Sequence, residues 1–441
     1  MPKIKPFRGV HYDPLRTYGL SPVIGPPQDL PDLGEAARIT QQHPYHSLRL
    51  ELGEPCGDSW TPPAEVRSRY FERWREDGLL LQSAEPAFFV HEHRYRHEGV
   101  YHRRLGLFAA ASLDEDHKTG FRPHEGTIPE NLSFRVQLLQ QLRLSITPIF
   151  TLIRDAGWLG VVLSDLVHAR PPDLSGHDAE EGIHRVWTLH DPYLINWLQD
   201  LAADRPLYIA DGHHRLAAAK TYRDHLVAQG VDPGPAGFVL TLIVSEFDPG
   251  VSILPIHREV RRVPVAWDQA QSRLDELFDV ECVLSGEQID PDLVDRRARR
   301  LADSTSDMPE FLMIRHDDQR LLRIRLRDHD AIAEFVDDSI AAPVRDLDVT
   351  VLHRVLLEHV LGIPTDDPEG LVRYQPDGAA LTERVQEGTS ELGMFMRNPR
   401  IEQVLAVADA GAFMPQKSTY FYPKVPAGVV MYDLESQPPI R

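Results

Sequence analysis

Cysteine and long apolar runs are both scarce in this sequence. Its 441 residues include two cysteines, Cys56 and Cys282, which by themselves form neither a disulfide framework nor a zinc site. Such scarcity is typical of a reducing compartment, and we expect a cytoplasmic protein. The longest apolar stretches, such as 105–111 and 238–244, fall well short of the roughly 20 residues that span a bilayer. We therefore expect no membrane-spanning helix and, since no apolar segment follows the basic first residues, no signal peptide.

The signature motifs of several large enzyme classes are also missing. The sequence contains no G-x-x-x-x-G-K-[ST] phosphate loop, no G-x-G-x-x-G after a strand, no G-x-S-x-G and no kinase catalytic loop. It contains no H-E-x-x-H zinc motif either. The standard nucleotide-binding folds are therefore not indicated.

Positive charge is in deficit. Lysine and arginine together number 47 against 67 aspartates and glutamates, which gives a formal net charge of −20. A chain this acidic repels nucleic-acid phosphates unless one face is strongly basic. The densest basic cluster, 296–300, follows three aspartates and is typical of one side of a solvated helix. We expect no nucleic-acid partner, and the sequence does not indicate an oligomeric state.

What the sequence does contain is a mixture of helix and strand patterns, which predicts a mixed α/β (α+β) fold. At about 100–200 residues per domain the length allows two to three domains, and we expect an α/β region over 1–245 and a second over 246–441. Asp191 is expected to cap a helix that has Pro192 at its first position. The other expected elements are a hairpin over 88–113, a helix over 130–144, a strand over 146–153, a polar loop over 171–181, strands over 183–189, 206–210 and 238–244, and, in the second region, helices over 267–278, 291–302 and 349–361.

The strongest local signal for chemistry is the tract Asp211-Gly212-His213-His214-Arg215. An apolar strand ends and a helix begins there, so the free amides and the positive dipole end of the helix attract anions. Gly212 allows close approach of a ligand, the histidines and Arg215 add donors, and Asp211 could bind a Mg²⁺ that accompanies a phosphate. The alternative is that Asp211 only caps the helix and the histidines are surface donors.

Two further tracts could carry chemistry. His124-Glu125-Gly126-Thr127 combines a carboxylate with a histidine and a hydroxyl, so Glu125 could act as a general base; alternatively it pairs with Arg122 or Arg135. Pro415-Gln416-Lys417-Ser418-Thr419 could bind an oxyanion, and hydrogen bonding within the loop is the alternative.

Zinc coordination by the histidines has weaker support. His213 and His214 are adjacent, so they point in different directions. His91 and His93 are spaced by two and lie on one face of a strand. With no third partner nearby in the sequence, we interpret that pair as part of a solvated strand face.

The sequence resembles the domain of unknown function 1015 family over nearly its whole length, and several tracts match in order. These tracts are residues 4–9, 124–127, 148–150, 184–187, 209–215, 254–258 and 414–419.

The Asp211–Arg215 tract further resembles the ParB/sulfiredoxin superfamily, which implies a ParB/sulfiredoxin-like core with added α/β segments. The free serine kinases of that superfamily pair an upstream glutamate with the aspartate of this turn, and Glu125 and Asp211 are the matching positions. The resemblance implies Mg²⁺ with ATP or ADP, Asp211 at the metal, and phosphate binding by Gly212, His213, His214 and Arg215. Residues expected to touch the substrate or support the site are His124, Thr127, Arg258, Lys417 and Ser418.

Three functions compete on this basis. The first is a nucleotide-dependent phosphotransferase acting on a small hydroxyl-bearing metabolite, with serine as a candidate. The second is a ParB-like switch that binds or hydrolyses a nucleotide without a small acceptor. The third is a DNA-associated protein, against which the net charge of −20 argues. We also expect Lys417 to lie within reach of the Asp211–Arg215 turn, as an extra cation for phosphate.

Overall fold

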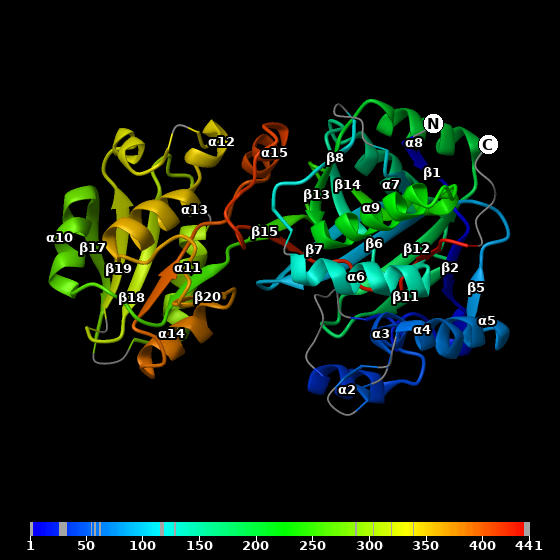
Figure 1. Cartoon of the computed structure of the whole chain (residues 1–441), viewed down its shortest axis with the longest axis horizontal. Helices are drawn as coiled ribbons and strands as arrows, with labels where there is room; N and C mark the ends of the chain where they lie inside the picture. The colour runs from blue at the N-terminus through cyan, green and yellow to red at the C-terminus, as the bar shows by residue number, and fades with distance from the viewer. Residues whose placement is uncertain are drawn as a thin grey trace. The chain divides into compact units, whose positions relative to one another are not determined.

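Two compact units make up the chain: Met1–Ser252 together with Pro423–Arg441, and Ile253–Tyr422. This division differs from the expected one, 1–245 and 246–441, mainly because the last segment returns to the first unit. The computed structural model, drawn in Figure 1, describes residues 3–25, 33–53, 55–56, 59–60, 63–114, 119–127, 129–286, 289–302, 304–318, 320–337 and 339–435.

A large mixed sheet organises the first unit. Its strand order is β11-β12-β6-β7-β14-β10-β13-β8, and β1 pairs with β7. The bounds are β1 (Ile4–Lys5), β6 (Phe88–His97), β7 (Val100–Ser112), β8 (Phe121–Arg122), β10 (Ile149–Ile153), β11 (Leu174–His177), β12 (Ile183–Leu189), β13 (Leu207–Asp211) and β14 (Phe238–Ser245). The expected hairpin is confirmed as β6 and β7, which pair antiparallel through a turn at Glu98 and Gly99.

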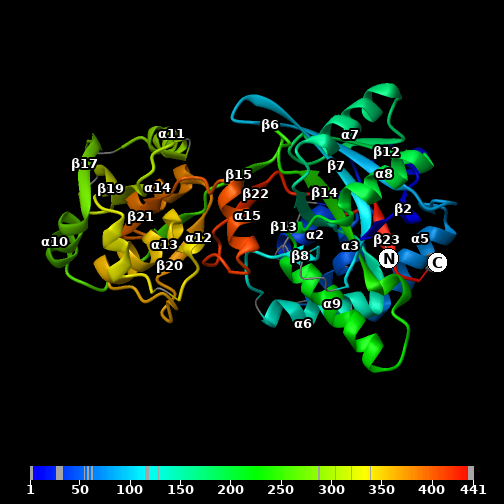
Figure 2. The ribbon, with the colours of Figure 1, turned by 90° about the horizontal axis from the view of Figure 1, so that it is seen from above.

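The longer helices of this unit pack on that sheet. The helices are α6 (Pro129–Leu142), α7 (Trp158–Ala169), α8 (Pro192–Ala203) and α9 (His213–Ala228). Leu159 and Leu163 of α7 share a core with Leu198 of α8 and with side chains of β6 and β7. Leu216 and Ala219 of α9 share another with strands β10, β13 and β14. Figures 1 and 2 both show α6 running beside α9.

A second, smaller sheet joins the two ends of the chain, in the order β5-β2-β23-β9. Its strands are β2 (Gly9–Tyr12), β5 (Leu80–Gln82), β9 (Leu144–Ser145) and β23 (Met431–Asp433). The remaining elements of the unit are α1 (Pro14–Thr17), α2 (Leu33–Gln42), α3 (Leu48–Leu52), β3 (Pro55–Cys56), β4 (Ser59–Trp60), α4 (Pro63–Val66), a π-helical segment (Arg67–Glu72), α5 (Arg73–Glu76) and a 3₁₀ turn (Gly234–Gly237).

The second unit is an α/β body of its own, built on a sheet of order β17-β19-β18-β21-β16-β20. Helices α11 and α14 pack on it through Val294, Leu301 and Leu381. Its elements are β15 (Ser252–Leu254), β16 (His257–Val260), α10 (Trp267–Leu277), β17 (Phe278–Ser285), α11 (Pro291–Ala302), β18 (Glu310–Arg315), β19 (Arg320–Leu326), a 3₁₀ turn (Asp330–Glu334), α12 (Ala342–Arg345), α13 (Asp348–Val351), a π-helical segment (Leu352–Val360), β20 (Val372–Gln375), α14 (Gly378–Gln386), β21 (Leu392–Phe395), α15 (Ile401–Asp409) and β22 (Tyr420–Tyr422).

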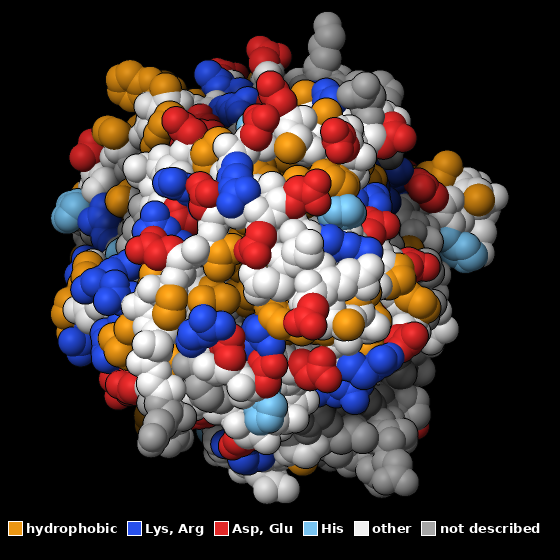
Figure 3. Space-filling view, turned by 90° about the vertical axis from the view of Figure 1, so that its left-hand side faces the viewer, with side chains coloured by type: hydrophobic (Ala, Val, Ile, Leu, Met, Phe, Trp, Pro, Cys, Tyr) orange, Lys and Arg blue, Asp and Glu red, His pale blue; other side chains and the backbone are white. Residues whose placement is uncertain are grey.

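The mixed α/β class is therefore confirmed, while the ParB/sulfiredoxin-like core stays a prediction. Among the described helices, none combines the length and the apolar character needed to cross a membrane. On the face drawn in Figure 3, acidic and basic side chains are interspersed, so the described surface there carries no broad basic region.

Two local expectations on the sheet were wrong. The polar loop expected over 171–181 contains strand β11, which pairs with β12. His91 and His93, expected on a solvated face, are buried at 1% and 2% exposure; β12 pairs with their strand and places His184 against both rings.

Candidate functional site

A short turn connects strand β13 to helix α9. Leu207, Tyr208, Ile209 and Ala210 are buried in the sheet, and the strand ends at Asp211. Gly212 then reverses the chain with φ 99° and ψ 27°, and α9 begins at the next residue. This left-handed conformation favours glycine, which has no Cβ to strain it. A Cβ at this position would in addition lie 3.1 Å from the Arg215 guanidinium. The strand–turn–helix expected from the sequence is present.

The first turn of α9 suits an anion. Within the described residues no side chain caps this helix, and its first turn carries no acidic residue. Its leading amides and the positive end of its dipole therefore face the space beside the turn. His214 and Arg215 are half-buried there.

Asp211 lies between two cations. Lys424 Nζ is 3.3 Å from its Oδ1, and the Arg215 guanidinium donates to its Oδ2. Arg215 also donates to the Pro148 carbonyl at 2.5 Å, which ties the turn to the residue before β10. Burial alone would raise the pKa of Asp211, but the charges of Arg215 and Lys424 outweigh it and the pKa lies below its ordinary value.

Two buried histidines connect the turn to the Glu125 tract. The rings of His124 and His213 meet edge to face with centroids 4.8 Å apart. Burial lowers the pKa of His213 to about 4 and that of His124 well below its ordinary value, so both rings are neutral at pH 7. Nε2 of His213 has no hydrogen-bond partner among the described residues, which leaves it available to a ligand.

Sheet topology explains why these tracts meet. β8 pairs parallel with β13, so Phe121 lies opposite Leu207 and Arg122 opposite Tyr208. Chain segments that follow parallel neighbours emerge at the same edge of a sheet. The His124–Thr127 tract therefore begins beside the Asp211–Arg215 turn. Glu125 is half-buried there, while Thr127 is exposed.

The remaining expected site residues belong to the second unit. Arg258 is fully buried, donates to His353 Nε2 at 3.2 Å and to the Lys417 carbonyl at 3.3 Å, and lies over the Tyr374 ring. Ser418 is buried and donates to the Pro415 carbonyl within its loop. These contacts fix the 415–419 loop inside its own unit. The roles of Arg258, Lys417 and Ser418 at the turn, and the reach of Lys417 to it, stay predictions.

Sequence reasoning missed two features beside the turn. Lys424, which contacts Asp211, follows the Pro415–Thr419 tract that contains Lys417, and nothing in the sequence favours Lys424 over Lys417. A cleft of about 70 Å³ also lies beside Arg215 and is lined by Glu51 and Thr147. Thr147 donates to Glu51 at 3.2 Å, a contact across 96 residues that no local pattern could indicate.

Three solved structures are among those that match this chain, all with low TM-scores and low identity. A conserved hypothetical protein from Pyrococcus furiosus has a TM-score of 0.33 and 14% identity, and the match covers 75% of this chain and 96% of that one. A free serine kinase in complex with AMP has a TM-score of 0.32 and 13% identity, covering 72% and 86%. SbnI with a C-terminal truncation, from Staphylococcus aureus, has a TM-score of 0.36 and 12% identity, covering 72% and 84%.

Sequence comparison identifies the family. No curated protein matches the chain significantly. The model of the family described as "Protein of unknown function (DUF1015)" matches residues 4–350, which include both the His124–Thr127 and the Asp211–Arg215 tracts. The chain therefore belongs to the DUF1015 family.

Proposed function

We propose that this protein is a nucleotide-dependent phosphotransferase that acts on a small hydroxyl-bearing metabolite, with serine as the first acceptor to test. The observation that carries the proposal is the meeting of two tracts at one sheet edge. An anion-attracting helix start follows β13, and a tract with a half-buried carboxylate follows the parallel strand β8. Phosphoryl transfer needs both a phosphate-binding surface and a group that orients and deprotonates the acceptor.

Phosphates would bind at the start of α9. Backbone amides of its first turn and the guanidinium of Arg215 are the donors that phosphate oxygens prefer. Arg215 and Lys424 now contact Asp211, with Lys424 at 3.3 Å. A polyphosphate carries more charge than one carboxylate, so it would attract both cations away from Asp211. The turn thus holds cations in place for a phosphate ligand and keeps them neutralised until one arrives.

Magnesium fits this arrangement through one residue. Mg²⁺ usually binds nucleotides with one or two protein carboxylates, the other positions being filled by phosphate oxygens and water. Asp211, at the end of β13 and with a side chain 27% exposed, supplies one such carboxylate. Both of its oxygens contact cations, so Asp211 would be free to hold the ion only where those cations bind the phosphates instead. The ion would neutralise charge on the transferred group.

Glu125 is the proposed general base. Its carboxylate would accept the proton of the acceptor hydroxyl, the acceptor oxygen would form a bond to the terminal phosphorus, and the bond from that phosphorus to the nucleoside diphosphate would break. The buried rings of His124 and His213 beside this tract are neutral, so they present ring nitrogens without adding positive charge.

The experiment is an assay of ADP formation from MgATP with and without serine and related hydroxy acids. ADP that forms only with an acceptor, together with a phosphorylated acceptor seen by ³¹P NMR, supports the phosphotransferase. ADP that forms equally without any acceptor favours the hydrolysing switch. The absence of MgATP and MgADP binding in calorimetry contradicts both.

A further inference from the structure

A cluster of buried histidines lies in the same unit on strands β6 and β12, apart from the turn at Asp211. His91 and His93 lie on one face of β6, and His184 of β12 is directly opposite His93 in the register. The three side chains are 1%, 2% and 0% exposed. Their rings stack, with centroids 4.0 Å apart for His93 and His184 and 5.2 Å apart for His91 and His184. So many histidines are rarely buried together without a ligand or a hydrogen-bonding role.

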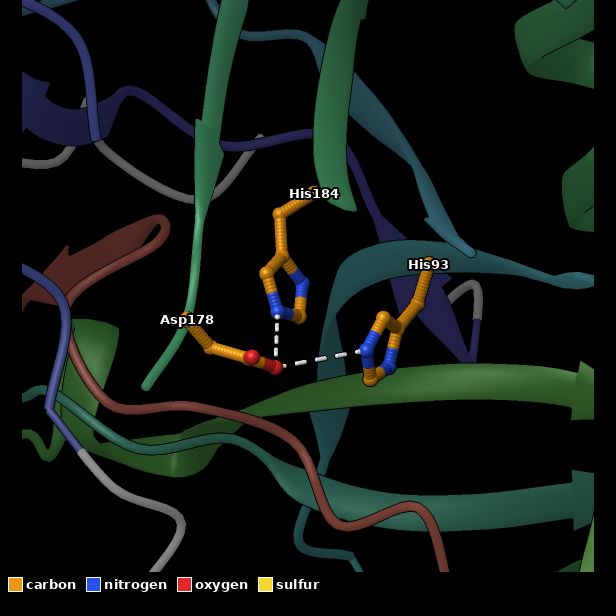
Figure 4. A group of neighbouring side chains, drawn as sticks. All are labelled: His93, Asp178 and His184. Atoms are coloured by element: carbon orange, nitrogen blue, oxygen red, sulfur yellow. Dashed lines mark hydrogen bonds and ion pairs between the residues drawn. The ribbon is translucent and has the colours of Figure 1, made fainter. Parts of the chain in front are cut away.

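One carboxylate points into this cluster. Asp178 follows β11, and its Oδ2 is 2.9 Å from His184 Nε2 and 3.5 Å from His93 Nε2 (Figure 4). Its other oxygen accepts from the amides of Glu180 and Gly182 at 2.9 and 2.7 Å, which fixes the carboxylate in place. Three potential ligand atoms, from His93, Asp178 and His184, thus lie within 4.8 Å of one another.

His93 lacks hydrogen bonds within the described part of the chain. Neither of its ring nitrogens has a hydrogen-bond partner there, and the 3.5 Å approach to Asp178 is too long for a good one. Leaving a buried polar group without a partner costs free energy, because the group has lost its bonds to water. A buried nitrogen that has no good hydrogen bond and lies 3.5 Å from a fixed carboxylate oxygen is placed as a metal ligand would be.

Gly182 keeps the space between these atoms open. A Cβ at this glycine would lie 2.6 Å from both Asp178 Oδ2 and His93 Nε2. Gly182 is not among the glycines with positive φ, so the backbone conformation does not by itself require a glycine. Its lack of a side chain instead leaves a gap between two ligand atoms.

We propose that His93, Asp178 and His184 bind a divalent transition-metal ion, with Zn²⁺ the representative, and that His91 orients His184. Ligands about 2.1 Å from a tetrahedral zinc are about 3.4 Å from one another, and the two separations from Asp178 Oδ2 are 2.9 and 3.5 Å. Two imidazoles and one carboxylate suit zinc, iron or nickel better than magnesium or calcium, which prefer oxygen ligands only. Three protein ligands leave a fourth position for water or substrate, and the 22% exposure of the Asp178 side chain gives it a route to solvent.

His91 supplies the outer contact that metal-bound histidines need. Its Nε2 is 3.0 Å from Nδ1 of His184. When His184 binds an ion through Nε2, its proton resides on Nδ1 and is donated to His91, which fixes the ring. Replacing such an outer partner typically weakens metal binding about 10- to 100-fold. His91 is a positioning residue that does not itself bind the ion. Replacing it should therefore lower the affinity for the metal without changing the number of ions bound per chain.

The test is Zn²⁺ binding to the full chain after chelator treatment, measured by competition with a chromophoric chelator and by elemental analysis. We expect one ion per chain, unaffected by excess Mg²⁺. Asp178→Asn and His93→Gln should abolish stoichiometric binding, and His91→Phe should weaken it about 10- to 100-fold. Gly182→Ala, which keeps every ligand and fills the gap, should also abolish it. His177→Gln, an exposed histidine beside Asp178, is the matched control and should bind as the parent does.

Circular dichroism and thermal melts establish that each variant is folded. Zn²⁺ should raise the melting temperature of the parent and of His177→Gln but not that of Gly182→Ala. The proposal is overturned if the folded parent binds no Zn²⁺, or if folded Gly182→Ala and Asp178→Asn bind it as the parent does. None of these measurements depends on phosphoryl transfer. The proposed metal site can therefore be contradicted without contradicting the proposed phosphotransferase function, and the reverse.

Discussion

Asp211 is the residue whose contacts decide most about the chemistry of the turn. It holds Arg215 and Lys424, and their charges keep its pKa below the ordinary value despite burial. The sequence placed Asp211, Gly212 and Arg215 correctly at the end of a strand and the start of a helix. It could not identify Lys424, because that contact joins positions 211 and 424 and no local pattern reports on it.

Asp211→Asn should abolish Mg²⁺-dependent nucleotide binding while leaving some Mg²⁺-independent binding. The amide no longer offers a charged ligand to the ion, but Arg215 and Lys424 remain to meet the phosphates. Calorimetric titration of ADP with and without Mg²⁺ measures both. Identical titrations for parent and variant would remove Asp211 from the metal site.

Arg215→Ala should weaken nucleotide binding by about 1.5–3 kcal/mol, the range for a charged hydrogen bond. It also loses the contact with the Pro148 carbonyl, so a small drop in melting temperature is expected. Lys220→Ala, on the same helix beyond its first turn, is the control. Equal nucleotide affinity in Arg215→Ala and the parent would contradict a phosphate role for this arginine.

At the scale of elements, the turn depends on how β8 and β13 pair. The helix that begins at Pro192 and its cap, Asp191, which accepts from two first-turn amides, were predictable because capping is a local rule. The pairing of β8 with β13 was not predictable, because β8 is two residues long and has no periodicity to detect.

The buried histidines of β6 were misinterpreted because their burial, too, depends on a strand distant in sequence. Two histidines spaced by two on one face of a strand predicted a solvated face, but His184 of β12, distant in sequence, packs against both.

Gly212→Ala should strain the same turn. Alanine at φ 99° costs about 1–2 kcal/mol, and its Cβ would press on the Arg215 guanidinium at 3.1 Å. We expect a melting temperature lower by a few degrees and weaker nucleotide binding. Gly160→Ala is a suitable control, since a Cβ there meets nothing within 4 Å. If Gly212→Ala melts and binds like the parent, the turn does not need its left-handed glycine.

For the whole molecule, buried neutral histidines make stability depend on pH. Burial lowers the pKa of His46, His213 and His257 to about 4 and that of His93 and His353 to about 3. In the unfolded chain these groups titrate near 6.5. Below that pH the unfolded state binds protons that the folded state does not, so the stability present above pH 6.5 is lost as pH falls toward 4 and 3.

The free energy of unfolding should therefore fall between pH 6.5 and 4 by roughly 1.4 kcal/mol per pH unit for each such histidine. Urea unfolding in chelator-containing buffer at pH 7.5, 6 and 5 measures this free energy, provided that the unfolding of each of the two units is monitored. A stability that stays level or rises from pH 7.5 to 5 would show that the histidines are not held neutral.

The pairing of β23 with β2 and β9 could not be predicted from the sequence, since it joins the two ends of the chain.

The most direct test of the proposed function is acceptor-dependent ADP formation by Glu125→Gln beside the parent. Glutamine keeps the size of the side chain but cannot take the acceptor's proton, so turnover should fall about 10²–10⁴-fold while ADP affinity is unchanged. Glu85→Gln, an exposed glutamate elsewhere in the same unit, should turn over like the parent. Parent-like turnover by folded Glu125→Gln would contradict the account, because the carboxylate that follows β8 would then have no part in the reaction.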